Sequence, residues 1–354
     1  MAIINGKLGG TDPSDGDILT AANFTDTNNA MIEKANYRPS YPDIFRVGLK
    51  TEVMIGHSST HMSVIADSGS IYSTADSGVT WVVKNTDLDS GDYIGINCKA
   101  NRAYGVAIEG ATTTSEVILT TNSGVTWTTV TSAAFTTGGA YCVSYPTTSL
   151  IVLGGNDGVS GKHIVFSTDG GSNWTDATTQ PGAAIWAVSM YDGTTGYAVD
   201  SAKNIWKTAD GAVTWTNTGD DVSDTGDSGN NLVAISDDVC IFIGAEGVLN
   251  HYDNSTGTII EKLNLPLDNT TYSLIQTTDG TIYCMSVNDI ATGFPGQILL
   301  ISHDSGVTWQ VGNISNIVTT SAWNSYYKYM LSEADDNQVM VGQGNFNILR
   351  FSLY

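Results

Sequence analysis

A chain of 354 residues with 36 acidic and 14 basic side chains has a formal net charge of −22, which argues against binding to nucleic acid or to anionic lipid. No apolar run approaches the ~18 residues of a membrane-spanning helix, so we expect no membrane insertion. Residues 1–10 lack a basic segment followed by an apolar core, so we expect no secretory signal peptide and synthesis in the cytoplasm.

Residues 1–41 differ from the rest of the chain, and we treat them as a separate segment for anchoring or oligomerisation. The sequence predicts a helix over residues 20–35, because Thr20 is a good N-cap and a seam then recurs at spacings of 3 and 4. The seam residues are Ala21, Phe24, Asn28, Met31 and Ala35. Two heptads are marginally stable alone, so we expect the helix to pack on a partner or on copies of itself in a homo-oligomer. The alternative is a helix that packs on its own globular domain.

Residues 42–354 carry a repeated octapeptide, Ser/Thr-x-Asp-x-Gly-x-Thr-Trp. Residues 74–81 and 302–309 are clean copies, and residues 167–174 depart from the pattern only at Asn173. Residues 120–127 have Asn122 in place of Asp, and residues 208–215 have Ala212 in place of Gly. The Trp residues at 81, 127, 174, 215 and 309 lie 46, 47, 41 and 94 residues apart, so one copy has decayed in the last interval. A fixed period of this length is typical of a repeat architecture.

Each copy lies between two short segments rich in Val, Ile, Thr and aromatic residues, a pattern that predicts a hairpin. The Asp carboxylate can accept backbone N–H groups across the turn, Gly permits positive φ, and Trp offers a large apolar surface. We therefore expect a structural role, rather than a catalytic one, for the following residues. They are Asp76, Gly78, Trp81, Asn122, Trp127, Asp169, Trp174, Asp210, Trp215, Asp304, Gly306 and Trp309.

At these residues the sequence resembles the Asp-box (BNR) repeat of sialidases, sortilin-type receptors and the photosystem II assembly-factor propeller. The resemblance implies an all-β fold, a β-propeller of four-stranded blades. Counting units predicts seven blades over residues 42–354, with the last unit starting at residues 322–331 and lacking one strand. We expect residues 43–49 to supply that strand and close the ring, which removes open sheet edges.

Residues 9–26, which include the run Asp15-Gly-Asp-Ile-Leu-Thr-Ala-Ala-Asn23, resemble the N-terminal segment of tailed-phage fibres and other virion proteins. In those proteins a similar stretch precedes a helix that attaches the protein to the particle. The resemblance implies that residues 1–41 bind other virion proteins and that the chain is located in a virion.

Sialidase chemistry needs three arginines that converge on the substrate carboxylate, because the planar guanidinium binds carboxylate in a bidentate manner. The chain has only Arg38, Arg46, Arg102 and Arg350, and the predicted blades do not bring three of them together. We therefore predict that the protein is not an enzyme. A glycoside hydrolase is kept as the third hypothesis.

A ligand is expected on the propeller face opposite the octapeptide turns, where three predicted loops are long. Trp186, Trp323 and Tyr326 are candidates for stacking on a sugar, with packing between blades as the alternative. The predicted loop over residues 218–231 carries Asp220, Asp221, Asp224 and Asp227. These could hold Ca²⁺, although a solvated acidic loop is the simpler interpretation and we predict no cofactor. The abundance of Asp fits either a saline environment or the many turns.

The four cysteines, Cys98, Cys142, Cys240 and Cys284, fall in predicted strands of different blades. We expect buried free thiols, with Cys98 and Cys142 as the pair to check for a disulfide.

The leading hypothesis is thus a non-enzymatic virion structural protein, of the tail-fibre or decoration type, that presents a propeller to a host-surface receptor or glycan. The alternative is a cellular propeller that serves as an assembly factor or adhesion module.

Overall fold

The computed structural model describes residues 43–46, 51–66, 69–85, 93–109, 116–130, 135, 139–157, 161–222, 232–244, 248–264, 272–287, 297–312, 331–335, 338–343 and 347–352. Every regular element in these ranges is a β-strand. The predicted fold class is therefore corrected in its helical part: the described residues contain no helix, and the helix expected over residues 20–35 lies outside them.

The strands form four-stranded antiparallel sheets, and six of these sheets consist of four consecutive strands. Sheets 1 to 3 are β2 (Thr51–Gly56), β3 (Met62–Ala66), β4 (Ile71–Thr74) and β5 (Val82–Asn85); β6 (Tyr93–Asn97), β7 (Gly105–Glu109), β8 (Val117–Thr120) and β9 (Thr128–Val130); and β10 (Gly139–Ser144), β11 (Ile151–Asn156), β12 (Ile164–Ser167) and β13 (Thr175–Asp176). Sheets 4 to 6 are β14 (Ile185–Met190), β15 (Gly196–Asp200), β16 (Asn204–Thr208) and β17 (Thr216–Asp221); β18 (Leu232–Ala234), β19 (Val239–Ile243), β20 (Val248–Asp253) and β21 (Thr258–Asn264); and β22 (Tyr272–Gln276), β23 (Ile282–Val287), β24 (Gln297–Ser302) and β25 (Gln310–Gly312).

The remaining sheet, sheet 7, is composite. It joins β26 (Leu331–Asp335), β27 (Gln338–Gln343) and β28 (Asn347–Ser352) to β1 (Asp43–Arg46) from the other end of the chain. Strand β1 pairs antiparallel with β28, from Asp43 opposite Arg350 to Arg46 opposite Asn347. The last unit was predicted to start with a strand at residues 322–331; the innermost described strand of this sheet is β26, and residues 322–330 lie outside the described ranges.

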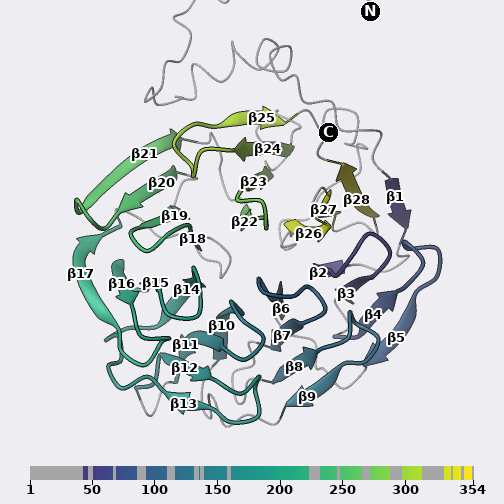
Figure 1. Ribbon diagram of the computed structural model, residues 1–354, viewed down its shortest axis with the longest axis horizontal. Coiled ribbons are helices and arrows are strands. Elements are labelled where there is room, and N and C mark those ends of the chain that lie inside the picture. The colour runs from purple at the N-terminus through teal and green to yellow at the C-terminus, as the bar shows by residue number, and fades with distance from the viewer. Residues whose placement is uncertain are drawn as a thin grey trace, which may run out of the picture.

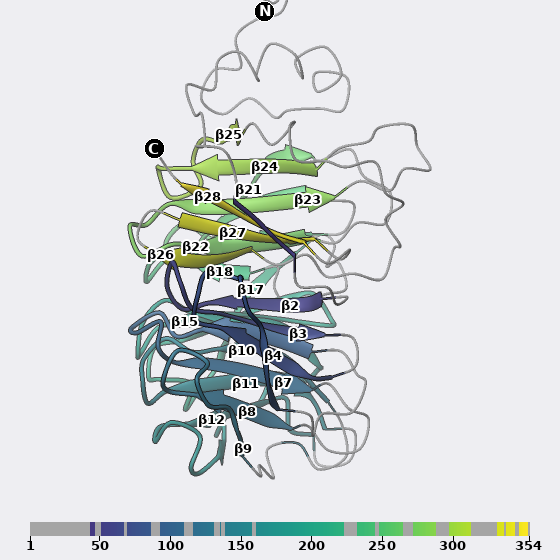
Figure 2. The ribbon, with the colours of Figure 1, turned by 90° about the vertical axis from the view of Figure 1, so that its right-hand side faces the viewer.

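The sheets are arranged as a ring around a central axis (Figure 1). In sheets 1 to 6 the first strand is innermost and the last is at the periphery, and in sheet 7 β26 is innermost and β1 is at the periphery. Seen from the side, the strands run across the thickness of the ring (Figure 2). Because consecutive strands alternate in direction, the first–second and third–fourth connections of sheets 1 to 6 lie on the same face of the ring. We call it the turn face, because it carries the octapeptide turns.

The core lies between neighbouring sheets, and the octapeptide tryptophans connect them. Trp127 of sheet 2 belongs to a cluster with Val53 and Ile65 of sheet 1, and Trp215 of sheet 4 belongs to a cluster with Val152 and other residues of sheet 3. Two further tryptophans, Trp174 and Trp309, likewise pack on clusters shared with the preceding sheet. Each of these four copies therefore ties its own sheet to the one before it.

Candidate functional site

The five octapeptide turns share one hydrogen-bond scheme. In the first, the Thr74 hydroxyl donates to Asp76 Oδ1 at 2.7 Å and accepts the Gly78 N–H at 2.9 Å. The Asp76 carboxylate then accepts the Thr80 N–H at 2.8 Å and the Thr80 hydroxyl at 2.6 Å. Hydrogen bonding, above all from the Thr80 hydroxyl, lowers the pKa of Asp76 to about 2, so the turn is built around an ionised carboxylate.

The worn copies keep the same scheme. Asn122 accepts the Thr126 N–H through Oδ1 at 2.9 Å and donates from Nδ2 to the Thr126 hydroxyl at 2.8 Å. Ala212 takes the place of Gly at a φ of 72° and donates its N–H to Thr208 at 3.2 Å. The amide of Asn122 and the methyl group of Ala212 are therefore accommodated without loss of the turn, which explains why substitution is tolerated at these positions.

Glycine in other copies lets the turn come close to the preceding sheet. A Cβ on Gly171 would lie 2.7 Å from Leu119 of sheet 2, and Gly171 has a φ of 92°. Backbone hydrogen bonds also join the turns to their own sheets: Ser77 N donates to Thr60 O at 3.0 Å, and Ser123 N donates to Ala103 O at 2.9 Å. The turns thus fasten the first–second connection of their own sheet.

We expect Asp304→Ala to cost about 1–2 kcal/mol of unfolding free energy, because it removes acceptors for Ser302 and for Thr308 on an exposed turn. Asp304→Asn should cost less than half of that, since Asn122 makes equivalent bonds in sheet 2. Urea denaturation of the two variants measures the difference. Equal losses would mean that the carboxylate charge, rather than the hydrogen-bond pattern, stabilises the turn.

At the axis, the connection between β6 and β7 (residues 98–104) reaches several other sheets. Lys99 N donates to Tyr145 O of sheet 3 at 3.0 Å, and Lys99 Nζ donates to Met190 O of sheet 4 at 3.2 Å. On the other side, Arg102 Nη2 donates to Thr278 Oγ1 of sheet 6 at 2.9 Å and lies 3.4 Å from Glu333 Oε1 of sheet 7. This connection therefore extends across the axis of the ring on the turn face.

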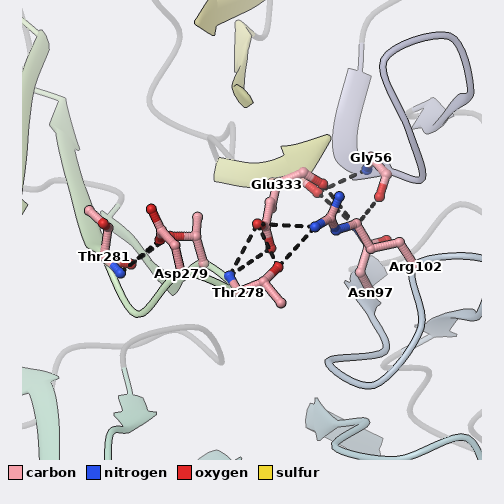
Figure 3. A network of polar contacts seen from close by, with 9 residues as sticks. Gly56, Asn97, Arg102, Thr278, Asp279, Thr281 and Glu333 are labelled. Carbon is pink, nitrogen blue, oxygen red and sulfur yellow. Dashed lines mark hydrogen bonds and ion pairs between the residues drawn. The ribbon is translucent and has the colours of Figure 1, made fainter. Parts of the chain in front are cut away.

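Glu333 is the centre of the polar network drawn in Figure 3. Its carboxylate accepts the Thr278 N–H at 3.1 Å and the Thr278 hydroxyl at 2.7 Å, besides the Arg102 guanidinium. Burial raises the pKa of this carboxyl, although Thr278 and Arg102 favour its charged form. The three residues come from sheets 2, 6 and 7, so their contact depends on ring closure.

A second network holds the backbone of Arg102. Burial lowers the pKa of His57 to about 4, so the ring is neutral at neutral pH. Since Arg102 O can only accept, His57 Nδ1 carries the proton and donates to it at 2.7 Å, which leaves Nε2 to accept from Ser63 Oγ at 3.1 Å. Ser63 Oγ lies 2.9 Å from Ser73 Oγ, which accepts the Trp127 N–H at 3.4 Å. The contact between Ser63 and His57 therefore helps to hold the backbone of Arg102 in place.

Behind the Arg102 network lies a cavity of about 140 Å³, lined by the first strands of all the sheets. Buried serines on four of these strands join neighbouring sheets. Ser144 Oγ accepts Met190 N at 2.9 Å, Ser189 Oγ accepts Ala234 N at 3.0 Å, Ser273 Oγ accepts Leu331 N at 2.9 Å and Ser332 Oγ accepts Gly56 N at 2.8 Å. Asn97 adds a bridge by donating from Nδ2 to Gly56 O and to Glu333 O.

The ligand candidates predicted from the sequence are only partly described. Trp186 lies at a β-bulge near the start of β14 and is half-buried. Asp220 and Asp221 lie in β17 rather than in a loop, and Asp220 accepts the Tyr252 hydroxyl at 2.8 Å. The remaining candidates, Trp323, Tyr326, Asp224 and Asp227, and the anchor residues Ala21, Phe24, Asn28, Met31 and Ala35, lie outside the described residues. The face opposite the turns stays a prediction.

Sequence reasoning missed the axial residues. Asn97 pairs with Gly105, Ser144 with Val152, Ser189 with Tyr197 and Ser332 with Met340, so each is paired with the residue eight positions later. This common register places Asn97, Ser144, Ser189 and Ser332 at one level along the axis of the ring. A polar residue at the same hairpin position of several repeats was the available signal.

The described ranges also bear on metals, thiols and membrane spans. They hold no group of three or more His, Cys, Asp or Glu side chains positioned for a metal ion. All four cysteines are buried and unpaired, so the predicted free thiols are confirmed and Cys98 and Cys142 are not linked. No helix within these ranges is long and apolar enough to span a membrane.

Solved structures resemble the chain over most of its length. One, entitled "YCF48 bound to D1 peptide", has a TM-score of 0.62 at 16% identity and covers 90% of this chain and 96% of its own. The WD40 β-propeller domain of Doa1 has a TM-score of 0.62 at 12% identity and covers 90% of this chain and 97% of its own. The chain is a β-propeller. We refer below to its sheets as blades.

The enzyme of glycoside hydrolase family 74 from Niastella koreensis has a TM-score of 0.60 at 19% identity, over 86% of this propeller and 53% of that chain. No family model matches the sequence, and no curated protein matches it. At these identities, the likeness to solved structures shows the fold alone. Function must therefore be argued from the residues of this chain.

Proposed function

We propose that this protein is a non-enzymatic component of a virus particle, of the tail-fibre or decoration type. In this role residues 1–41 attach it to other virion proteins, and its propeller presents a surface for host attachment, including attachment to glycans. The observation that carries the attachment role is the sequence of residues 9–26, which resembles the attachment segment of tailed-phage fibres. Residues 1–41 precede β1 in the sequence, so an anchor there would be joined to the closing blade.

The proposal of a non-enzymatic role is supported by polar groups that are already bound to other groups of the protein. The carboxylates of the octapeptide turns, which we take to be Asp-boxes, accept hydrogen bonds from their own turns, as in Asp76 and Asp210. Arg102, the arginine that lines the central cavity, is bound to Thr278 and Glu333. The sequence has only three further arginines, Arg38, Arg46 and Arg350.

The anchor can be tested with variants of the full chain. Phe24→Asp combined with Met31→Asp introduces two charges on the predicted seam, and Thr27→Asp combined with Asn29→Asp introduces the same charge off the seam. We expect the first pair to lower incorporation into particles at least about tenfold, the effect of ~1.4 kcal/mol or more at one contact, and the second pair to leave it unchanged. Immunoblots of purified particles give the measurement, and equal incorporation of both variants would contradict the anchor.

A second candidate is a cellular propeller that binds a peptide as an assembly factor. It is favoured by the match to YCF48, a structure solved with a D1 peptide, which extends over 96% of that chain. Fractionation separates the two proposals: a virion component accumulates in purified particles, whereas a cellular assembly factor stays with the cell. Turnover of fluorogenic glycosides by the purified protein would instead favour the third hypothesis, a glycoside hydrolase.

A further inference from the structure

The axial cavity is lined by buried serines whose hydroxyls can donate hydrogen bonds. Ser144, Ser189, Ser273 and Ser332 line it, each is at least nine-tenths buried, and each Oγ accepts a backbone N–H. No hydroxyl of these four donates to a protein group among the described residues. A serine that accepts in this way still has its own O–H to donate.

Lys99, in the turn-face connection between β6 and β7, adds a positive charge to the residues that line the cavity. Its ammonium donates to Met190 O, a bond that uses one of its three protons. Asp192 also acts on Lys99 electrostatically, but its Oδ1 accepts from Thr194 and Thr195. The ammonium therefore retains donors for a guest.

The residues that line the cavity include one carboxylate. It belongs to Glu333, and its oxygens already accept from Arg102 and Thr278. Asn97 Oδ1 is buried without a partner, and Gln276 offers one group of each kind. The serine hydroxyls and the Lys99 ammonium can all donate to one guest, an arrangement that suits an anion, since hydrogen bonds to a charged acceptor are the strong ones.

The volume of the cavity and its apolar side chains further limit the ligands that fit. The volume of about 140 Å³ is close to the ~150 Å³ of an engineered cavity that binds benzene, so an organic molecule of a few heavy atoms fits. Side chains such as Val143, Val188 and Leu274 provide an apolar wall beside the serines. We propose that the cavity is a binding site for a short-chain aliphatic carboxylate, with the carboxylate towards Lys99 and the serine hydroxyls, and the alkyl group on the apolar wall.

Trifluoroacetate and trifluoroethanol provide a matched pair of probes, since they share the apolar group and differ in charge. In chloride-free buffer we expect the full-length protein to broaden the ¹⁹F signal of trifluoroacetate, to leave that of trifluoroethanol sharp, and to release trifluoroacetate when acetate or propionate is added. No broadening of trifluoroacetate would mean that the cavity holds water only, and this result would overturn the proposal. Equal broadening of both probes would overturn the role of charge.

Variants locate the site. Lys99→Met should weaken trifluoroacetate binding about tenfold, because it removes a charge-assisted hydrogen bond. The control Lys84→Met removes the same charge from the peripheral strand β5 and should leave binding within about twofold. Ser144→Ala combined with Ser189→Ala should also weaken binding; if that variant does not fold by circular dichroism, the lysine pair alone decides. Equal affinity of Lys99→Met and Lys84→Met would contradict the proposal.

Discussion

Replacing Trp215 by alanine is expected to cost about 3–5 kcal/mol of unfolding free energy, among the largest losses that one substitution can produce in this chain. Trp215 is 1% exposed and belongs to a cluster that combines Leu150 and Phe166 of blade 3 with Val188 of blade 4. Its indole N–H donates to Ala212 O at 3.2 Å, which fixes the ring under the turn. Truncation would open a cavity between two blades rather than within one.

The measurement is urea denaturation followed by far-ultraviolet circular dichroism, which does not depend on the tryptophan signal. Trp174→Ala is the matched control, because Trp174 occupies the same position of the repeat but is only half-buried. We expect the control to lose clearly less stability, in proportion to the smaller apolar area that it buries. A loss for Trp215→Ala no greater than for Trp174→Ala would show that burial of the tryptophan between blades 3 and 4 does not set the size of the loss.

The octapeptide made most of the ring predictable. Its Asp and Gly specify a hairpin, its Trp must be buried, and the spacing from Trp81 to Trp127 and Trp174 allows one sheet per interval. These signals are local, so they can be interpreted without knowing how the neighbouring blades pack. The signal is weak in the last unit, which has no octapeptide. Its first strand was predicted at residues 322–331, whereas the innermost described strand is β26, whose Glu333 and Asp335 are of a type depleted in strands.

The axial site was not predictable in the same way, because ring closure creates it. Arg102 and Glu333 are 231 residues apart in the sequence, and neither belongs to the repeated motif. Placing Arg102 on a turn was possible, but its partners depend on which connections point to the axis. Serines such as Ser189 are ordinary residues in a strand, and only the shared register with Asn97 and Ser332 marks them as lying at one level along the axis of the ring.

Glu333→Ala is expected to cost about 2–3 kcal/mol, because it leaves a partly buried guanidinium and the Thr278 N–H without their acceptor. The side chains of Arg102 and Glu333 are 21% and 14% exposed, so solvent screens this pair less than a surface pair. Burial raises the pKa of Glu333, which makes the charged form the costly one; Glu333→Gln, which keeps one acceptor oxygen, should therefore lose less than Glu333→Ala.

A double-mutant cycle with Arg102→Met isolates the pair, and we expect a coupling of about 1–2 kcal/mol in urea denaturation. Lys162 and Asp176 provide the matched control, since their ion pair is short, at 2.9 Å, but their side chains are 30% and 47% exposed. That control cycle should give under about 1 kcal/mol and should weaken with added salt. Because blades 2 and 7 meet through Arg102 and Glu333, the alanine variant should also speed amide exchange in β26 and β6, while β16 on the far side of the ring stays protected. Unchanged exchange in β26 together with a coupling near zero would mean that the ring stays closed by β1 and the serine bonds alone.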